Sequence, residues 1–270
     1  MQPFSVLLSV YIKENPVYLE QALNSIWVDQ ILKPSQIVIV KDGILTEELN
    51  LVIEKFKEKA PLTIVELEKN MGLGLALNFG LKKCDYNLIA RMDSDDISLP
   101  DRFLNQVNFF EKNPSIDIIS GNINEFDIIP TNILTSRILP ENHEKLIKYS
   151  KTRNPLNHMA VMFKKEAVIN VGGYKDFWQF EDYYLWARLI NKGYILHNLN
   201  TVLVNARFSS KALVRRKGVD YAISEWKFQK KLIDLNIMTK IDFIIYAPVK
   251  FLIRLMPSIF LSFIYNKLLR

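Results

Sequence analysis

The first half of the chain alternates short apolar runs with segments of helical spacing. Apolar, β-rich runs typical of strands that are buried on both faces lie at residues 4–11, 36–40, 62–67 and 86–92. Between them, apolar residues recur every three or four positions, as in Glu47–Lys59. Strand, crossover helix and strand form the unit of a parallel sheet. We therefore expect an α/β fold with a mostly parallel central sheet flanked by helices.

Length and composition agree with a packed domain of this class. The chain has 270 residues, of which 49% are hydrophobic and 24% charged, so global disorder is excluded. The single cysteine, Cys84, excludes a disulfide within the chain, which fits a reducing compartment. No basic stretch precedes the first apolar run, so we expect no secretory signal. We expect one domain at residues 1–205, a basic loop and helix at 206–240, and a C-terminal tail at 241–270.

The charge balance limits the classes of partner. The formal net charge is +6 and the pI is about 9.1, which suits nucleic acid, anionic lipid or phosphorylated small molecules. The basic residues gather at Arg207–Lys217 and in the C-terminal stretch, without the interleaved aromatic residues of a nucleic-acid surface. We therefore expect phosphate and membrane partners and no nucleic acid.

The C-terminal tail is apolar and basic together. Residues 241–270 are rich in Ile, Leu and Phe, but Lys250 and Arg254 interrupt this set and Pro248 and Pro257 break it. No uninterrupted stretch reaches the roughly 20 apolar residues that span a bilayer. Such a segment suits an amphipathic helix lying in the interface of an anionic leaflet. The alternative is a helical pair packed on the first domain.

An acidic cluster follows the fourth predicted strand. The carboxylates of Asp93, Asp95 and Asp96 lie within four residues and repel one another. Divalent metals take hard oxygen ligands, and phosphate oxygens of a substrate can complete the shell. In a parallel sheet, ligands sit at the carboxyl ends of the strands, where Asp42 of Lys41-Asp42-Gly43 also falls. The alternative is a polar turn with an aspartate at a helix N-cap.

Several motifs occur in one order over about residues 4–205. They are Ser9-Val10-Tyr11 with Glu14 and Pro16, Val40-Lys41-Asp42-Gly43, Asn70-Met71-Gly72-Leu73 with Ala76, Asn78 and Gly80, Ala90–Asp96 with Pro100-Asp101-Arg102, Gly172-Gly173-Tyr174, and Glu181–Trp186. With these motifs the chain resembles the family 2 glycosyltransferases, inverting enzymes with the nucleotide-diphospho-sugar transferase (GT-A) fold. Together with the basic, apolar tail it resembles bacterial enzymes of O-antigen and exopolysaccharide assembly.

The resemblance implies a set of donor-binding residues. Asp42 lies where the family binds the uracil ring, and Asp93, Asp95 and Asp96 would hold Mn²⁺ or Mg²⁺ against the diphosphate, with Asp95 favoured over Asp96 as the direct ligand. An Asp-Gly turn is the alternative for Asp42, and pairing with a structural carboxylate is the alternative for Arg91. The full predicted nucleotide-sugar set is Tyr11, Glu14, Asp42, Asn70, Gly72, Asn78, Arg91, Asp93, His158, Arg215 and Arg216.

The pair Glu181-Asp182 is the predicted catalytic pair. Inverting transfer needs a general base that takes the proton of the acceptor hydroxyl. In similar enzymes the aspartate of this pair has that role, so Asp182 is the predicted base and Glu181 would bind sugar hydroxyls. The alternative is an acidic first helical turn that complements the helix dipole. His158 lies between the two acidic motifs, where a structural and a site role are both open.

Arg215 and Arg216 follow a polar stretch and precede Lys217-Gly218. Adjacent arginines beside a loop can clamp the donor diphosphate. The competing interpretation is contact with a lipid headgroup or with the pyrophosphate of a lipid-linked acceptor. Related bacterial proteins often have glycine where this chain has Lys217, which would stiffen the loop.

The resemblance implies transfer of glucose or galactose, in β-1,3 linkage, from a UDP-sugar to a lipid-linked sugar such as GlcNAc-diphospho-undecaprenol. The protein would then act peripherally at the cytoplasmic face of the inner membrane. Another donor or a non-lipid acceptor is the alternative. A metal-dependent phosphotransferase is disfavoured, because the first strand ends in Ser9–Lys13 without an aspartate nucleophile. A non-catalytic scaffold would not need Asp182 or the acidic cluster.

Overall fold

Four parallel strands from the first half of the chain form one side of the central sheet in the computed structural model, which describes residues 1–208 and 216–256. They are β1 (Phe4–Val10), β2 (Gln36–Lys41), β3 (Leu62–Glu66) and β4 (Leu88–Arg91), in the order β3-β2-β1-β4. Most residues of β1, β2 and β4 are buried, because helices cover both faces. The predicted parallel arrangement of these strands is confirmed.

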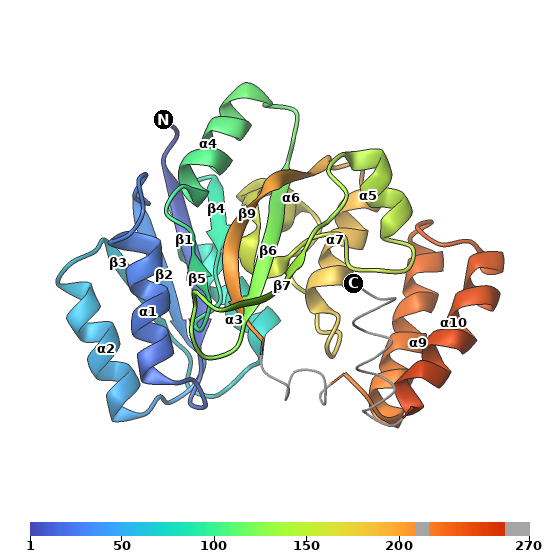
Figure 1. Cartoon of the computed structure of the whole chain (residues 1–270), viewed down its shortest axis with the longest axis horizontal. Coiled ribbons are helices and arrows are strands. Elements are labelled where there is room, and N and C mark those ends of the chain that lie inside the picture. Colours follow the sequence, from blue (N-terminus) through green and yellow to red (C-terminus); the bar gives the residue numbers. More distant parts are fainter. Residues whose placement is uncertain (209–215, 257–270) are drawn as a thin grey trace.

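The second half of the chain extends the same sheet with both orientations. Strand β8 (Met162–Lys164) is antiparallel to β4 and to β6 (Ile118–Phe126), whereas β9 (Leu196–Arg207) is parallel to β6. Strand β7 (Ile133–Arg137) is antiparallel to β6, and strand β5 (Ile97–Ser98) is antiparallel to β9. The sheet is therefore mixed, and its parallel order changes at β8. Beyond β8, strands β6 and β9 lie side by side (Figure 1).

Strands of the second half differ in extent from the sequence-based expectation. The strand expected at residues 116–119 is β6, which begins at Ile118 and continues to Phe126, because its polar side chains find hydrogen-bond partners. Asn124 donates to Oδ1 of Asn205 at 3.1 Å, and Oδ1 of Asn122 accepts from the Leu139 N–H at 3.2 Å. Conversely, the strand expected at 128–139 is confined to Ile133–Arg137. The one or two edge strands expected at 194–205 are one strand, β9, which β6 accompanies along most of its length.

Helices cover both faces of the sheet. The sheet therefore divides the hydrophobic core into two clusters, one on each face. Helices α1 (Pro16–Trp27), α2 (Glu47–Lys57) and α4 (Arg102–Lys112) pack on one face, where Val6, Leu8 and Val10 of β1 point. Helices α3 (Leu73–Lys83), α6 (Lys165–Asn170) and α7 (Glu181–Asn191) pack on the other face with Leu7. Alternate residues of β1 thus serve opposite layers. Helix α5 (His143–Tyr149) adds Leu146 to the second cluster, whereas Ala160 of a 3₁₀ turn (His158–Ala160) packs in the first.

Two C-terminal helices lie side by side at the end of the molecule away from α1 and α2 (Figure 1). Helix α9 (Val219–Asp234) buries Tyr221, Phe228 and Leu232 in the same cluster as α7. Helix α10 (Lys240–Leu255) begins with a capping box of Thr239 and Asp242.

The outer side of α10 is apolar and exposed. Ile241, Ile244, Val249 and Leu252 are 54–70% exposed. Among residues 1–208 and 216–256, no helix is both long and apolar enough to span a bilayer. Residues 257–270 of the expected membrane-associating tail lie outside the described residues.

Candidate active site

A cavity of about 440 Å³ lies where β4 ends and α7 begins. Its lining includes six of the residues that the sequence predicts for the site, namely Arg91, Asp93, His158, Glu181, Asp182 and Arg216. These residues come from segments up to 125 positions apart in the sequence, so the fold brings together the two acidic motifs. Other predicted residues, among them Asp95 and Asp96, lie outside this lining.

Arg91, the last residue of β4, is buried at 1% exposure and pairs through Nη2 with Oδ1 of Asp93. Its Nε and Nη1 atoms have no hydrogen-bond partner. A buried donor without an acceptor costs free energy that a bound ligand can recover. The guanidinium therefore places a buried positive charge beside Asp93, at the end of the cavity that Arg91 lines.

Asp95 and Asp96 lie against Arg207, the last residue of β9. Oδ1 of Asp96 accepts the Arg207 backbone N–H at 2.7 Å, and Arg207 Nε donates to the Asp95 carbonyl at 3.0 Å. Burial, with repulsion from Asp93, raises the pKa of Asp95 to about 6. Burial and repulsion from Asp95 raise the pKa of Asp96 well above its usual range. The cluster is therefore electrostatically strained when no cation is present.

This strain fits a divalent cation. The chemistry of the donor set is that of a hard metal, and Oδ2 of buried Asp96 has no hydrogen-bond partner. Among the residues that the structure describes, however, no group of three acidic, His or Cys side chains forms a ready cage. Asp93 is the carboxylate of the three that faces the cavity. A metal at this cluster would thus share its shell with substrate oxygens and water.

Glu181 and Asp182 form the first turn of α7 and face the cavity. The turn before them passes through Gln179, whose φ of 68° is unusual for a residue with a side chain and marks a backbone held in place by its surroundings. Asn154 Nδ2 donates to Oδ2 of Asp182 at 2.6 Å. Burial raises the pKa of Asp182, while the bond from Asn154 opposes the rise. Burial and the neighbouring Asp182 raise the pKa of Glu181 to about 7.

His158 and Asn78 are fixed by Tyr174, which follows the Gly172-Gly173 turn. The Nε2 atom of His158 lies 2.8 Å from the Tyr174 hydroxyl, and burial together with Arg91 lowers the pKa of His158 well below its usual range. Asn78 donates to the Tyr174 carbonyl at 2.7 Å and accepts its N–H at 2.8 Å. A Cβ at Gly173, where φ is +65°, would lie 2.4 Å from Oδ1 of Asn78. The side-chain nitrogen and the side-chain oxygen of Asn78 thus both hold the turn in place.

Asp42 follows β2 and holds the Asn70–Gly72 loop. Its two carboxylate oxygens accept the backbone N–H groups of Met71 at 2.6 Å and Gly72 at 3.1 Å. Asn70 donates to the Asp42 carbonyl at 3.4 Å. Asp42 is 4% exposed and does not line the cavity described here. In the structure the Asp42 carboxylate therefore holds the Asn70–Gly72 loop in place, and the predicted contact with the uracil ring would come in addition to this role.

The remaining predicted donor residues lie at other places. Tyr11 and Glu14 follow the carboxyl end of β1, with the Glu14 N–H donating to the Tyr11 carbonyl at 3.1 Å. Arg216 lines the cavity. Arg215 lies outside the described residues.

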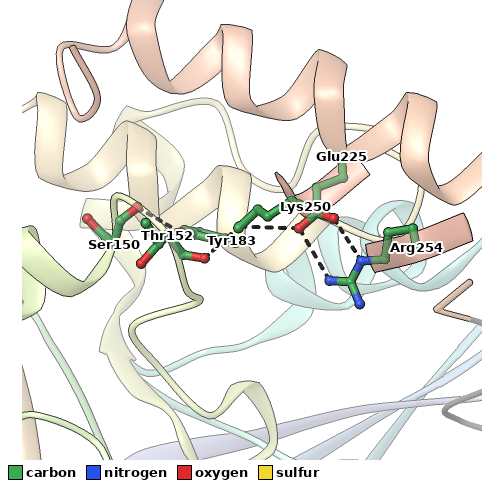
Figure 2. Close-up of polar contacts among 6 residues, drawn as sticks. All are labelled: Ser150, Thr152, Tyr183, Glu225, Lys250 and Arg254. Carbon is green, nitrogen blue, oxygen red and sulfur yellow. Dashed lines mark hydrogen bonds and ion pairs between the residues drawn. The ribbon is translucent and has the colours of Figure 1, made fainter. Parts of the chain in front are cut away.

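The opposite wall of the cavity carries a charged network that the sequence analysis did not predict. Glu225 of α9 accepts from Arg254 Nε at 2.8 Å and from Lys250 Nζ at 3.3 Å, and both cations come from α10 (Figure 2). Lys250 also donates to the Thr152 carbonyl at 2.6 Å. One signal in the sequence was available. Glu225 shares the helical stripe of Tyr221, Phe228 and Leu232, and a glutamate on an apolar stripe needs cationic partners.

Comparison with known proteins identifies the family. The model of "Glycosyl transferase family 2" matches residues 5–172 of this chain. The chain belongs to this family. It is therefore a glycosyltransferase by family, which decides against the phosphotransferase alternative.

Relatives of the chain extend over its full length. It is 41% identical, over 99% of its length and 96% of the relative, to the Escherichia coli UDP-Gal:alpha-D-GlcNAc-diphosphoundecaprenol beta-1,3-galactosyltransferase. It is 39% identical, over 98% of each protein, to the amylovoran biosynthesis glycosyltransferase AmsE of Erwinia amylovora. Among solved structures, the mannosyltransferase PcManGT of Pyrobaculum calidifontis in complex with GDP-Man and Mn²⁺ matches with a TM-score of 0.68 and 16% identity over 93% of this chain and 72% of that one. This likeness confirms the GT-A fold.

Proposed function

We propose that this protein is an inverting, metal-dependent glycosyltransferase that moves a hexose from a UDP-sugar to a sugar carried on a lipid diphosphate. The observation that carries the proposal is the convergence of Asp93 and the Glu181-Asp182 pair on one cavity. The relative that is 41% identical over nearly the whole chain supports galactose as the first donor to test, with glucose next, and a β-1,3 linkage.

The proposed reaction is a single displacement. The acceptor hydroxyl oxygen attacks the anomeric carbon on the face opposite UDP, the bond from that carbon to the UDP oxygen breaks, and its electron pair leaves with UDP. Asp182 takes the proton of the attacking hydroxyl. The bond from Asn154 orients the Asp182 carboxylate, and burial makes that carboxylate a stronger base than a solvated one. Glu181, beside it, accepts hydrogen bonds from sugar hydroxyls.

The donor diphosphate belongs at the β4 end of the cavity. The buried guanidinium of Arg91 supplies positive charge at this end of the cavity, which favours a phosphate group there. Asp93 and Asp95 would hold Mn²⁺ or Mg²⁺ there, which when bound supplies positive charge for the departing UDP. Asp96 supports the position of this cluster, because its Oδ1 accepts the backbone N–H of Arg207 in β9.

We also propose peripheral attachment to the cytoplasmic face of the inner membrane through α10 and the tail. The exposed row that includes Ile244, Val249 and Leu252 presents apolar side chains, and Lys227 and Lys230 of α9 lie at the edge of the same surface. A helix with one apolar exposed side and neighbouring lysines binds anionic membrane interfaces.

The test is UDP release by the pure protein with Mn²⁺ and a synthetic GlcNAc-diphosphate-lipid. UDP-galactose, UDP-glucose and their N-acetyl forms are compared, with and without a chelator. We expect acceptor-dependent release with one donor, lost on chelation. Release with none of the four donors would reject the UDP-hexose assignment, and release that ignores the acceptor would reject the lipid-linked acceptor.

A further inference from the structure

The cavity has a basic wall, formed by Arg153, Arg216, Lys250 and Arg254. These residues come from three separate segments, namely the stretch after α5, the stretch before α9, and α10. The carboxylate of Glu225 binds two of them, Lys250 and Arg254. The wall therefore gathers cationic side chains that the proposed transfer chemistry does not use.

This wall is held in place before any ligand arrives. Glu225 is 3% exposed, and it binds Arg254 through Nε at 2.8 Å and through Nη2 at 3.3 Å. Lys250 is fixed between Glu225 and the Thr152 carbonyl. Figure 2 shows these contacts joining α9, α10 and the segment after α5, where Tyr183 donates to the Ser150 carbonyl at 2.7 Å. Cations positioned in this way bind an anion without further loss of side-chain freedom.

Electrostatics favours an anion here. Burial lowers the pKa of Lys250, and the neighbouring Arg254 and Arg153 guanidinium groups act in the same direction because like charges repel. Helix α9 begins beside the wall, since the Gly218 N–H donates to the Arg254 carbonyl at 2.9 Å. The positive end of its dipole adds to the same field. An anion of two or more charges would relieve this repulsion.

The wall and the predicted base contact the same short segment of the chain. Lys250 binds the carbonyl of Thr152, and Asn154, two residues further on, binds Asp182. Thr152 and Asn154 lie at most roughly 7 Å apart, because two residues of extended chain span no more than that. The base and the wall therefore contact neighbouring points of one segment, and a sugar whose hydroxyl meets Asp182 can direct its anomeric substituent toward the wall.

We propose that the basic wall binds the diphosphate of the acceptor and so selects acceptors whose attacked sugar is attached directly to that diphosphate. This inference rests on the proposed function. The donor diphosphate is already assigned to the Arg91 and Asp93 end of the cavity, which leaves the wall for a second anion. Helix α10 carries Lys250 and Arg254 on one side and the exposed apolar row on the other, which suits a diphosphate anchored in a membrane.

The test compares two soluble acceptors that differ in the diphosphate alone. One is GlcNAc α-linked through diphosphate to a short alkyl chain, and the other is GlcNAc α-linked directly to the same chain. The ratio of their kcat/KM values is measured for the wild type, Arg254→Gln, Lys250→Gln and the control Lys57→Gln, whose side chain is exposed on α2 and lies outside the cavity lining. We expect each cavity variant to lower the ratio by roughly tenfold or more, with the KM for the donor unchanged. The control should keep the wild-type ratio.

Two kinetic results would overturn the proposal. If a cavity variant loses kcat/KM equally with both acceptors, the wall has only a structural role. If the KM for the donor rises while the ratio of acceptor kcat/KM values is unchanged, the wall binds the nucleotide instead.

Calorimetric titration of donor-free protein with the diphosphate acceptor separates this proposal from the proposed function. Binding by the wild type that weakens at least tenfold in Arg254→Gln supports the wall even if no UDP-sugar is consumed. Failure of the wild type to bind overturns it, whether or not sugar is transferred.

Discussion

Asn154 donates a hydrogen bond of 2.6 Å from its side-chain amide to Oδ2 of Asp182. The bond acts on the predicted base in two ways. Together with the Tyr183 N–H, which donates to Oδ1 at 2.7 Å, it fixes the orientation of the carboxylate, and it opposes the rise in pKa that burial causes. The position of Asn154, between the Lys250 contact at Thr152 and the catalytic pair, makes this short segment the link between the two walls of the cavity.

Replacing Asn154 with Ala should shift the pH profile of the reaction. Without the donated bond the carboxylate form of Asp182 is less favoured, so its pKa rises further. Because the base acts in its deprotonated form, we expect the acid limb of kcat/KM to move to higher pH by about one unit. The control is Asn105→Ala, which breaks an Asn–Asp contact with Asp101 outside the cavity. An unmoved acid limb in Asn154→Ala would contradict the role of Asp182 as base.

Glu181→Gln should stabilise the metal-free protein at alkaline pH. Burial and Asp182 raise the pKa of Glu181 to about 7 in the folded state, so the folded protein binds a proton that the unfolded chain has already lost. Stability is therefore lost as the pH rises from about 4.5 to 7. We expect Glu181→Gln to gain roughly 1 to 3 kcal/mol at pH 8 and nothing at pH 4. Unfolding by denaturant at both pH values measures the free energy of unfolding, with Glu166→Gln at an exposed position as the control. An equal gain at pH 4 and pH 8 would contradict the raised pKa of Glu181.

Glu225→Gln should have the opposite effect on stability. Burial acts to raise the pKa of Glu225, but Lys250 and Arg254 hold it below its ordinary value. Its contribution is present at neutral pH and is lost as the pH falls through the folded-state pKa. We expect Glu225→Gln to cost about 3 kcal/mol at pH 7, because two cations lose their buried partner, and less below pH 4. The control Asp234→Asn breaks an exposed pair with Lys231 and should cost under about 0.5 kcal/mol.

Gly173→Ala should destabilise the turn that carries Tyr174. A Cβ there meets Oδ1 of Asn78 at 2.4 Å and also requires an unfavourable φ of +65°. Gly193→Ala is a matched control, since its φ is +82° but no atom lies within 4 Å of the added Cβ. We expect Gly173→Ala to cost about 2 kcal/mol more than Gly193→Ala in thermal unfolding. Equal costs would show that Asn78 does not hold the turn.

The parallel half of the sheet and the location of the acidic motifs follow from local patterns. Strands such as β1 are continuous apolar runs, and Asp93 and Asp182 sit at element ends that those patterns mark. The Glu225 network could not be predicted in the same way, because its partners are 25 and 29 residues away on a second helix. Which side of α10 faces the cavity depends on its packing against α9. The hydrogen bond between Asn78 and Tyr174 could likewise not be predicted, because Tyr174 lies 96 residues further along the chain and only the fold brings the two together.

The most direct test of the account is the rate of UDP-sugar transfer by Asp182→Asn, measured with the donor and acceptor that serve the wild type. Asp176→Asn is the control, since Asp176 precedes the same helix but lies outside the cavity. We predict that Asp182→Asn retains the fold and donor binding while kcat falls by about 10²- to 10⁴-fold, and that Asp176→Asn keeps the wild-type rate. A folded Asp182→Asn protein with a near wild-type kcat would contradict the account.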